Sequence, residues 1–474
     1  MSNLLILVPF FSVILLSLIF RVKMKGAAFI LGAALSVLQV YLAIFYSNAV
    51  WNNSPFLFSN FLKLNLVVDN LSRVMLLSIG IVSFVTVFAA RYIIRDEGER
   101  FNFINLLLII LAGLNGIVLV RDIFSLYVFM EVVAVVSFIL IAFNKDIRAF
   151  EGAYKYIVLS TVATVLMLTS IALLVLIAGS TEFSAVSQAI KNSPHGMFVM
   201  SAAGLFICGL FIKAGIIPFH GWLPDVYSEA PPPASILLAG IATKTVGIYT
   251  LIRLVSSVFC FDSRINYVLM FVGVVSIVVA ALASLGQNDF KRMLAYSSIS
   301  QVGYIVLGLG CGTPLGLAGC VFHLFNHSIF KSLLFVNAAA VEFKTGSRDM
   351  NKISGLASGM PITATTSVLA GLSAAGIPPL SGFWSKLIII IALWGAGFYG
   401  YAVIAALASI LTLAYILSMQ RRVFFSKLPE GGQDIKEVGF TLALPALILG
   451  AITVGVGILF PFILNTFLSS FAFP

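Results

Sequence analysis

The sequence predicts an all-α polytopic membrane protein with about fourteen transmembrane helices, two inverted five-helix repeats and two broken helices. Of the 474 residues, 60% are hydrophobic and only 10% are charged, which excludes a soluble domain. Several apolar runs are longer than 18 residues, and such runs predict helices that cross a bilayer. Two of the runs are interrupted by proline close to a lysine, which indicates irregular backbone at membrane depth.

The apolar runs divide the chain into fourteen predicted spans. The first run is followed rather than preceded by positive charges, the wrong order for a cleaved signal peptide. Two tracts exceed the roughly 20 residues that a crossing needs, and 376-GIPPLSG-382 can interrupt the second of them. The predicted spans are 3–20, 26–46, 70–92, 102–120, 123–143, 154–178, 198–222, 232–256, 266–286, 291–310, 314–342, 360–391, 397–420 and 438–466.

Lysine and arginine residues are distributed unevenly over the predicted loops. With the N-terminus outside, eighteen lie at inner ends, six lie at outer ends and four lie within spans. This bias predicts that both termini are on the outer side of a cell inner (plasma) membrane. The inner set is Arg21, Lys23, Lys25, Arg91, Arg95, Arg100, Lys145, Arg148, Lys155, Lys291, Arg292, Lys344, Arg348, Lys352, Arg421, Arg422, Lys427 and Lys436, and the outer set is Lys63, Arg73, Arg121, Lys191, Arg253 and Arg264.

The order of the spans predicts an internal repeat. Spans four to eight and nine to thirteen each contain five helices, so the two sets must have opposite topology. In each set the fourth helix is interrupted by proline, at Pro218 and at Pro378–Pro379, and carries one lysine. The predicted division is therefore helices one to three in 1–101, a first repeat in 102–256, a second repeat in 257–420 and a last helix in 421–474.

The stretch 206–253 contains two lysines deep in apolar sequence, Lys213 before the first break and Lys244 in the next span. A lysine at mid-bilayer costs about 2.5–3.5 kcal/mol, so each needs a reason. Thr243 and Thr245 flank Lys244, and such small hydroxyl residues let helices approach and admit water. Two buried ammonium groups beside a broken helix indicate an ion path. The alternative for Lys244 is a side chain that snorkels to the membrane interface.

Glu131 is the only acid in the span 123–143, and its predicted partner is Lys213. An intramembrane carboxylate is expected to be neutral or paired with a cation. A pair that forms and breaks would change the affinity of the lysine for its proton and so drive a charge relay. The alternative is a static pair that only holds two helices in register.

The eleventh span carries 323-HLFNHSIFK-331, in which His323, His327 and Lys331 fall at i, i+4 and i+8 on one helical face. Two imidazoles in line with an ammonium suit proton transfer, because histidine exchanges protons near neutral pH. A zinc site and hydrogen-bonded core histidines are the alternatives. Lys386 follows the second break and is the predicted terminal group of the relay.

The remaining charged residues give weaker indications. His220, just after Pro218, can either satisfy backbone carbonyls freed by the break or join the relay. Five acids are more typical of loops and helix ends, and His195 has no assigned role; these acids are Asp69, Asp122, Asp225, Glu229 and Asp289.

Apart from the zinc alternative for His323 and His327, the sequence contains no indication of a cofactor or a metal. The four cysteines form no CxxC pair or Cys/His cluster, which argues against a metal or iron–sulfur site. No glycine-rich nucleotide-binding loop occurs. The net charge of +10 is spread over short loops, which argues against nucleic acid as a partner.

Six motifs together resemble one known family, the antiporter-like subunits of respiratory complex I, Mrp-type cation/proton antiporters and membrane-bound energy-converting hydrogenases. The resemblance extends from about the third to the thirteenth span. The motifs are 126-SLYVFMEVV-134, 213-KAGIIPFHGWLPDVYSEAP-231, 243-TKT-245, 289-DFKRMLAYSSISQVGY-304, 323-HLFNHSIFKSLLF-335 and 376-GIPPLSGFWSK-386.

The resemblance implies roles for individual residues. Glu131 is similar to the glutamate on the fifth helix of the family, Lys213 to the lysine in its broken seventh helix and Lys244 to the bridging lysine on its eighth. The stretch 323–331 resembles the relay on the eleventh helix, and Lys386 the terminal charge on the twelfth. Some complex I relatives have glutamate at that last position, so the lysine resembles the Mrp D-type and hydrogenase-type branch.

The implied function is proton translocation by one subunit of a multisubunit membrane complex, coupled to redox chemistry in partner subunits or to sodium/proton exchange. No motif in this chain binds electrons, so any redox reaction of a hydrogenase or of an NADH or ferredoxin dehydrogenase would belong to the partners. Expected partners are other membrane subunits, the lipid bilayer and protons, with sodium as a further ion. The alternatives are a stand-alone secondary transporter of a small solute and a purely structural membrane anchor.

Overall fold

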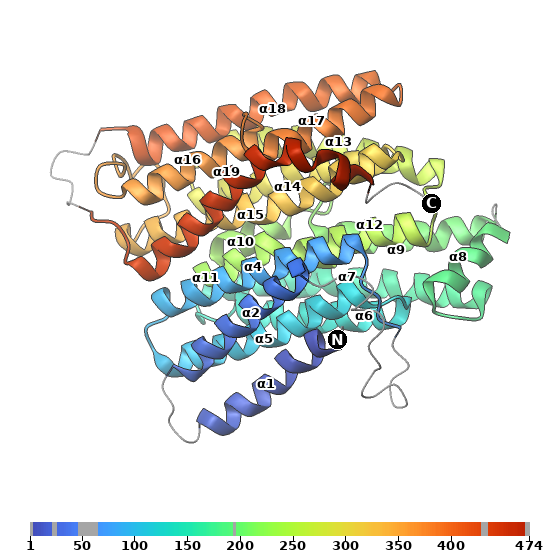
Figure 1. Cartoon of the computed structure of the whole chain (residues 1–474), viewed down its shortest axis with the longest axis horizontal. Helices are drawn as coiled ribbons and strands as arrows, with labels where there is room; N and C mark the ends of the chain where they lie inside the picture. The colour runs from blue at the N-terminus through green and yellow to red at the C-terminus, as the bar shows by residue number, and fades with distance from the viewer. Residues whose placement is uncertain (1–2, 21–25, 46–64, 193–195, 428–434, 470–474) are drawn as a thin grey trace. The chain divides into compact units, whose positions relative to one another are not determined.

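The computed structural model describes residues 3–20, 26–45, 65–192, 196–427 and 435–469, and within these ranges its regular structure is helical (Figure 1). Only isolated bridges between single residues occur besides the helices in these ranges. Twelve of the described helices are long and apolar enough to cross a membrane, and two shorter apolar helices cover 4–18 and 381–395. The predicted all-α, multi-span class is confirmed. Five residues named in the sequence analysis lie outside the described ranges: Arg21, Lys23, Lys25, Lys63 and His195.

The chain forms two compact units. The first contains 1–87, 94–215 and 241–262, and the second contains 88–93, 216–240 and 263–474. The first holds α1 (Leu4–Phe20), α2 (Ala27–Phe45), most of α4 (Asn70–Ile93), α5 (Glu97–Leu119), α6 (Ile123–Ile141), α7 (Ile147–Ala178), α8 (Phe183–Asn192), α9 (Met197–Ala214), η2 (Lys244–Tyr249) and α12 (Thr250–Ser257). The second holds α10 (Trp222–Glu229), α11 (Pro232–Leu237), α13 (Ser263–Leu285), α14 (Phe290–Gly310), α15 (Pro314–Thr345), α16 (Pro361–Ala375), α17 (Ser381–Gly395), α18 (Tyr399–Gln420), η3 (Arg421–Phe425) and α19 (Phe440–Ser469).

Both predicted interruptions coincide with helix ends. α9 ends at Gly215 (φ +67°) and α16 ends at Gly376 (φ +84°), and each glycine adopts the left-handed conformation that closes a helix. Proline follows within three residues and cannot continue the helix. The two segments, 214-AGIIPFHG-221 and 375-AGIPPLSG-382, share five of eight residues at equivalent positions.

Each unit also contains the same short backbone clamp. In the first unit Ile123 N–H donates to Thr181 O (2.8 Å) and Phe183 N–H to Arg121 O (3.1 Å). In the second unit Phe290 N–H donates to Arg348 O (2.9 Å) and Met350 N–H to Asn288 O (2.8 Å). Each of these four residues lies 167 positions after its counterpart in the first unit, as Phe290 does after Ile123. The clamped helices also correspond, because α7 and α15 both have 32 residues and end at a left-handed glycine.

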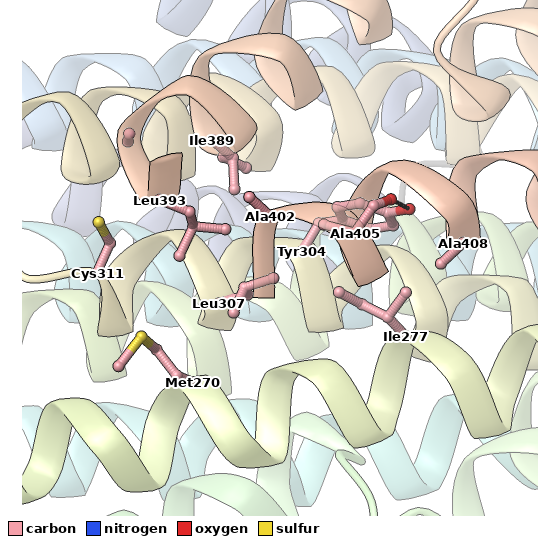
Figure 2. Close-up of a cluster of buried hydrophobic side chains, with 11 residues drawn as sticks. Met270, Ile277, Tyr304, Leu307, Cys311, Ile389, Leu393, Ala402, Ala405 and Ala408 are labelled. Atoms are coloured by element: carbon pink, nitrogen blue, oxygen red, sulfur yellow. Dashed lines mark hydrogen bonds between the residues drawn. The ribbon is translucent and has the colours of Figure 1, made fainter. Parts of the chain in front are cut away.

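In the second unit, α13, α14, α17 and α18 pack around an apolar cluster (Figure 2). Alanines on α18 and glycines on α13 and α14 allow this close packing. A Cβ added to Gly303 of α14 would lie 2.7 Å from the carbonyl oxygen of Gly273 on α13, so only glycine fits there. The buried cluster comprises Met270, Ile277, Tyr304, Leu307, Cys311, Ile389, Ala392, Leu393, Ala402, Ala405 and Ala408.

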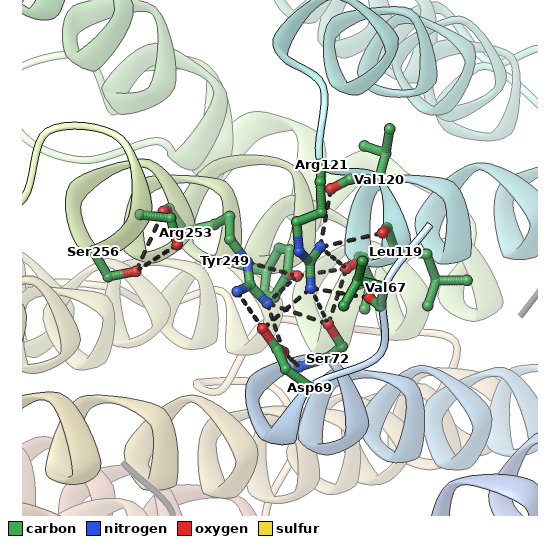
Figure 3. A network of polar contacts seen from close by, with 11 residues as sticks. Val67, Asp69, Ser72, Leu119, Val120, Arg121, Tyr249, Arg253 and Ser256 are labelled. Carbon is green, nitrogen blue, oxygen red and sulfur yellow. Dashed lines mark hydrogen bonds and ion pairs between the residues drawn. The ribbon is translucent and has the colours of Figure 1, made fainter. Parts of the chain in front are cut away.

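In the first unit, a buried polar network ties the start of α4 to the end of α5 and to α12 (Figure 3). Arg253 holds the Asp69 carboxylate with two hydrogen bonds (2.6 and 2.8 Å), and Arg121 adds a third (3.1 Å). Tyr249 accepts from Arg253 (2.9 Å) and donates to Val118 O (2.7 Å). Burial alone would raise the pKa of the Asp69 carboxyl. The nearby guanidinium groups of Arg253 and Arg121 lower it by more than burial raises it, so the pKa lies below its ordinary value.

Gly303→Ala tests the close contact between α13 and α14. Because the added Cβ would meet backbone rather than a flexible side chain, we expect the protein to lose about 1–3 kcal/mol of stability. The measurement is the thermal midpoint of unfolding in detergent. Gly204→Ala on α9 is the matched control, since nothing lies within 4 Å of its Cβ and alanine favours a helix. Equal midpoints for the two variants would contradict the packing argument.

Asp69→Asn tests the polar network. Removing the carboxylate leaves the guanidinium of Arg253, which is 5% exposed, without its charged partner. We expect a loss of stability on the order of 2 kcal/mol, less than for a fully buried pair because the Asp69 side chain is 40% exposed. The measurement is unfolding in detergent at pH 7 and at decreasing pH.

The pH dependence of this effect has a definite sign. Because the pKa of Asp69 is depressed in the folded protein, its stabilisation is present above the unfolded value of about 3.9 and is lost as pH falls through the folded pKa. The difference between wild type and Asp69→Asn should therefore shrink in strong acid. Glu151→Gln, in the exposed pair with Lys155, is the control and should change little at any pH. A difference that stays constant in acid would exclude the ion pair as its source.

Candidate proton-relay site

In the first unit, the structure pairs Lys213 with Glu131. Lys213 lies in the last turn of α9, and its Nζ donates to Glu131 Oε1 (3.0 Å) and to Ser160 Oγ (2.6 Å). The side chain of Lys213 is 1% exposed, whereas that of Glu131 on α6 is 28% exposed. Thr164 on α7 donates to the same Glu131 oxygen (2.8 Å). The ammonium is thus enclosed by α6, α7 and α9, and only its carboxylate partner faces outward.

The first break favours a cation at this place. The carbonyl end of a helix carries partial negative charge, and Lys213 lies within one turn of the end of α9. Lysine can donate three hydrogen bonds, and Glu131 and Ser160 accept two of them. The ammonium is therefore stabilised by a charge, a hydroxyl and a helix terminus, which is the kind of setting that an intramembrane lysine needs.

Lys244 begins a π-helical segment, η2, and is 1% exposed. Its Nζ donates to Thr243 Oγ1 (3.1 Å). This burial argues against a side chain that snorkels to an interface. A Cβ on Gly247 would lie 2.6 Å from Cα of Ala214, so η2 packs directly against the end of α9 beside Lys213. π-Helical turns occur often at functional sites, and the sequence analysis did not predict this one.

In the second unit, α15 is one continuous helix that carries His323, His327 and Lys331, all fully buried. Lys331 Nζ donates to Ser297 Oγ (2.7 Å) on α14, and Ser297 Oγ lies 2.8 Å from the hydroxyl of Tyr415 on α18. A ring nitrogen of His323, Nδ1, lies 2.8 Å from Ser385 Oγ on α17. Lys331 and His323 are thus linked to neighbouring helices by hydroxyl groups, which both donate and accept hydrogen bonds.

Lys386 lies on α17, one residue after Ser385, and is 3% exposed. Its Nζ stands 4.2 Å from the centre of the Tyr304 ring. A Cβ on Gly376 would lie 3.1 Å from Cδ of Lys386, so the lysine passes beside the second break. Both breaks therefore have a buried lysine next to their left-handed glycine.

The break residues themselves are less enclosed. Pro218, Pro378 and Pro379 are exposed, and His220 is half-buried with Nδ1 3.4 Å from Pro218 O. That contact is to a backbone carbonyl of the break, which is one of the two roles that the sequence leaves open for His220. In the part of the chain that the structure describes, no group of three or more His, Cys, Asp and Glu residues could hold a metal ion.

The structure gathers several acids and bases of the second unit into an ion-pair cluster. Arg348 contacts Glu229 (3.1 Å) and Asp289 (3.3 Å), and Arg292 pairs with Asp225 (2.5 Å). Lys291, counted above as an inner-loop charge, is instead 2% exposed and lies 3.4 Å from Glu342 of α15. Arg253, counted among the outer charges, is also buried.

Sequence reasoning did not identify Ser160 and Ser297 as hydroxyl partners of lysines, Thr164 as a partner of Glu131, or the ring of Tyr304 beside Lys386. Ser160 and Thr164 lie on α7 with no motif around them, and serine and threonine are common in apolar helices. Ser297 and Tyr304 fall inside the motif 289–304, which indicates that this segment is functional. The motif does not show which of its residues contact a lysine.

Comparisons with known proteins show the family of the chain. The family described as "NADH:quinone oxidoreductase/Mrp antiporter, TM" matches residues 120–412. A subunit N of NADH-quinone oxidoreductase from Desulforudis audaxviator is 32% identical over 407 residues, covering 83% of this chain and 81% of that protein. The D-type component of a Na(+)/H(+) antiporter from Alkalihalophilus pseudofirmus is 32% identical over 393 residues, covering 83% and 80%.

Solved structures show the same fold. A chain of the membrane-bound sulfane sulfur reductase, an archaeal respiratory membrane complex, matches with a TM-score of 0.88 and 27% identity over 99% of this chain and 96% of that chain. A chain of the Mrp complex from a Dietzia species matches with a TM-score of 0.84 and 26% identity over 99% and 96%. Because the family match spans more than half of the chain and these relatives cover most of it, this integral multi-pass membrane protein belongs to the NADH:quinone oxidoreductase/Mrp antiporter transmembrane family.

Proposed function

We propose that this chain is a proton-translocating, antiporter-like subunit of a multisubunit membrane complex. The observation that carries the proposal is the enclosed ion pair of Lys213 and Glu131 beside a broken helix. A buried ammonium is costly, and it is typical of ion pathways rather than of inert bundles. The relatives are subunits of complexes named as NADH-quinone oxidoreductases and sodium/proton antiporters, which supports the same function here.

In the first unit, we propose that Lys213 holds a proton that Glu131 controls. With the pair closed, the carboxylate stabilises the ammonium across 3.0 Å. When the pair opens, the ammonium loses its charged partner, and burial then favours the neutral amine and release of the proton. Lys244 is the proposed next acceptor, because η2 packs against the end of α9.

In the second unit, we propose that the buried residues of α15 and α17 pass the proton along. Lys331 shares Ser297 with Tyr415, and His323 contacts Ser385, the neighbour of Lys386. Hydroxyl groups can relay a proton because they donate and accept at once. Lys386 is the proposed terminal group. His327, one turn from both His323 and Lys331 on α15, is the proposed intermediate between them.

We further propose that the two sets of five helices are inverted repeats within a fourteen-span topology. The backbone clamps recur with a shift of 167 residues, as from Ile123 to Phe290, and the two break segments share five of eight residues. The lysine and arginine bias supports both termini on the outer side, and then the first clamp would face outward and the second inward. The fourteen spans are the twelve long helices together with α1 and the pair α16 and α17.

The partners that we propose are other membrane subunits, and the transported ion is the proton. The family includes subunits of redox complexes and of sodium/proton antiporters. In either kind of complex, this chain would supply the path for protons. Electron transfer or sodium movement would then drive or accompany it through other subunits.

Lys213→Ala tests the relay in the first unit. We expect proton pumping by the intact complex in membrane vesicles to fall by at least about tenfold, because proton-transfer groups contribute 10²–10⁴-fold to rates. Assembly of the complex should survive. Lys191→Ala, on the exposed end of α8, is the matched control and should pump normally. Full pumping by Lys213→Ala would exclude Lys213 from the path.

Glu131→Gln tests whether the carboxylate controls Lys213. A pair energy of about 1.4 kcal/mol changes the ratio of charged to neutral lysine tenfold, so we expect the number of protons moved per turnover to fall sharply. The measurement is the ratio of proton uptake to substrate turnover. Glu99→Gln, an exposed acid in the first turn of α5, should leave the ratio unchanged. An unchanged ratio in Glu131→Gln would leave Glu131 with a structural role only.

A further inference from the structure

Among the buried lysines of the second unit, Lys386 has a different environment from the others. Its Nζ has no hydrogen-bond partner among the described residues, although the side chain is only 3% exposed. Lys331 is held by Ser297 and Lys291 by Glu342. The group that faces the Lys386 ammonium is the aromatic ring of Tyr304 on α14, 4.2 Å away.

Tyr304 is itself fixed in place. It is fully buried, and its hydroxyl donates to Ala405 O (2.8 Å) and lies 3.0 Å from Ser409 Oγ, both on α18. The ring belongs to the apolar cluster of Figure 2, so neighbouring side chains restrict its rotation. The hydroxyl thus contacts α18, while the ring faces Lys386, and its centre lies 5.9 Å from the centre of the His323 ring.

We propose that Tyr304 is a positioning residue that holds Lys386 in its protonated state within the relay. The face of an aromatic ring carries negative charge and attracts an ammonium within about 6 Å. Unlike a carboxylate, the ring cannot accept the proton, so it stabilises the charge without competing for the proton. This inference rests on the proposed function, in which Lys386 is the terminal group of the second unit.

The other groups around Lys386 do not replace the ring. On α15, His323 contacts Ser385, and His327 and Lys331 follow along that helix. Further charge there would be positive and would oppose the ammonium. α16 and α19 contain no titratable residue, and the titratable residues of α18 are its tyrosines, of which Tyr415 contacts Ser297. The other titratable residues of α14 are Lys291, Arg292 and Tyr296, of which the first two are basic. Among the described residues, Tyr304 is therefore the group that favours the charged form of Lys386.

The test compares Tyr304→Leu with Tyr304→Phe in the intact complex. Proton pumping is measured in membrane vesicles as a function of pH. Loss of the ring in Tyr304→Leu should move the alkaline midpoint of pumping to lower pH by about 1–1.5 units, the size of a desolvated cation–π interaction. Tyr304→Phe keeps the ring and should keep the wild-type midpoint, even if loss of the hydroxyl contacts with Ala405 and Ser409 lowers stability.

Tyr227→Leu controls for the loss of a buried ring elsewhere. Tyr227 is fully buried in the same unit, and its ring packs edge-on against Phe335. This variant should lose stability without moving the pH midpoint. A midpoint that is unchanged in Tyr304→Leu, or shifted equally in Tyr304→Phe or Tyr227→Leu, would overturn the inference.

Lys386→Ala separates this inference from the proposed function. If pumping persists in Lys386→Ala, Lys386 is not part of the relay, and the proposed path in the second unit fails. If pumping is lost in Lys386→Ala but Tyr304→Leu keeps the wild-type midpoint, the relay stands and the role of Tyr304 alone is wrong.

Discussion

The energetic cost of a buried ammonium group governs the arrangement of both units. Each relay lysine lies within an apolar bundle, where an unpartnered charge costs several kcal/mol. A different group stabilises the ammonium at each lysine. Lys213 has a carboxylate, Lys331 has the hydroxyl of Ser297, Lys244 has the hydroxyl of Thr243, and Lys386 has the ring of Tyr304. Among these partners Glu131 alone is a carboxylate, and its side chain is 28% exposed. Such partners suit the gain and loss of protons that we propose for these lysines.

The helix breaks place two of these lysines. A left-handed glycine followed by proline ends α9 at Gly215 and α16 at Gly376, and neither helix can continue. Lys213 lies just before the first break, and Lys386 passes beside the glycine of the second. The broken helices therefore bring the partial charge of a helix terminus to the lysine, which a continuous helix would not do. The same local solution in both units is consistent with a common origin of the two halves.

The sequence predicted the elements and the charged residues better than their partners. The all-helical membrane class follows from composition, and the interruptions follow from glycine and proline, so both could be predicted from local chemistry. Glu131 could be matched with Lys213 because it is the only acid in its span. The contacts of Ser160 and Tyr304 could not be predicted from the sequence, because they depend on which faces of separate helices meet.

Burial of charge was the other property that sequence did not reveal. Lys291 and Arg253 lie near predicted span ends, where lysine and arginine are normally solvated. Their acidic partners, Glu342 and Asp69, are distant in the chain, and only the folded arrangement brings them within ion-pair distance. The π-helical segment at Lys244 likewise has no recognisable signal in composition or periodicity.

In the proposed function, Lys213 and Glu131 change their protonation and pairing during turnover. Infrared difference spectroscopy of the intact complex, recorded while it is driven, observes buried carboxyl and ammonium groups directly. We expect a turnover-dependent carboxylate band that disappears in Glu131→Gln and shifts when Lys213 is replaced. Turnover-dependent spectra that are identical in wild type and in both variants would exclude the proposed relay, because the pair would then be a static structural contact.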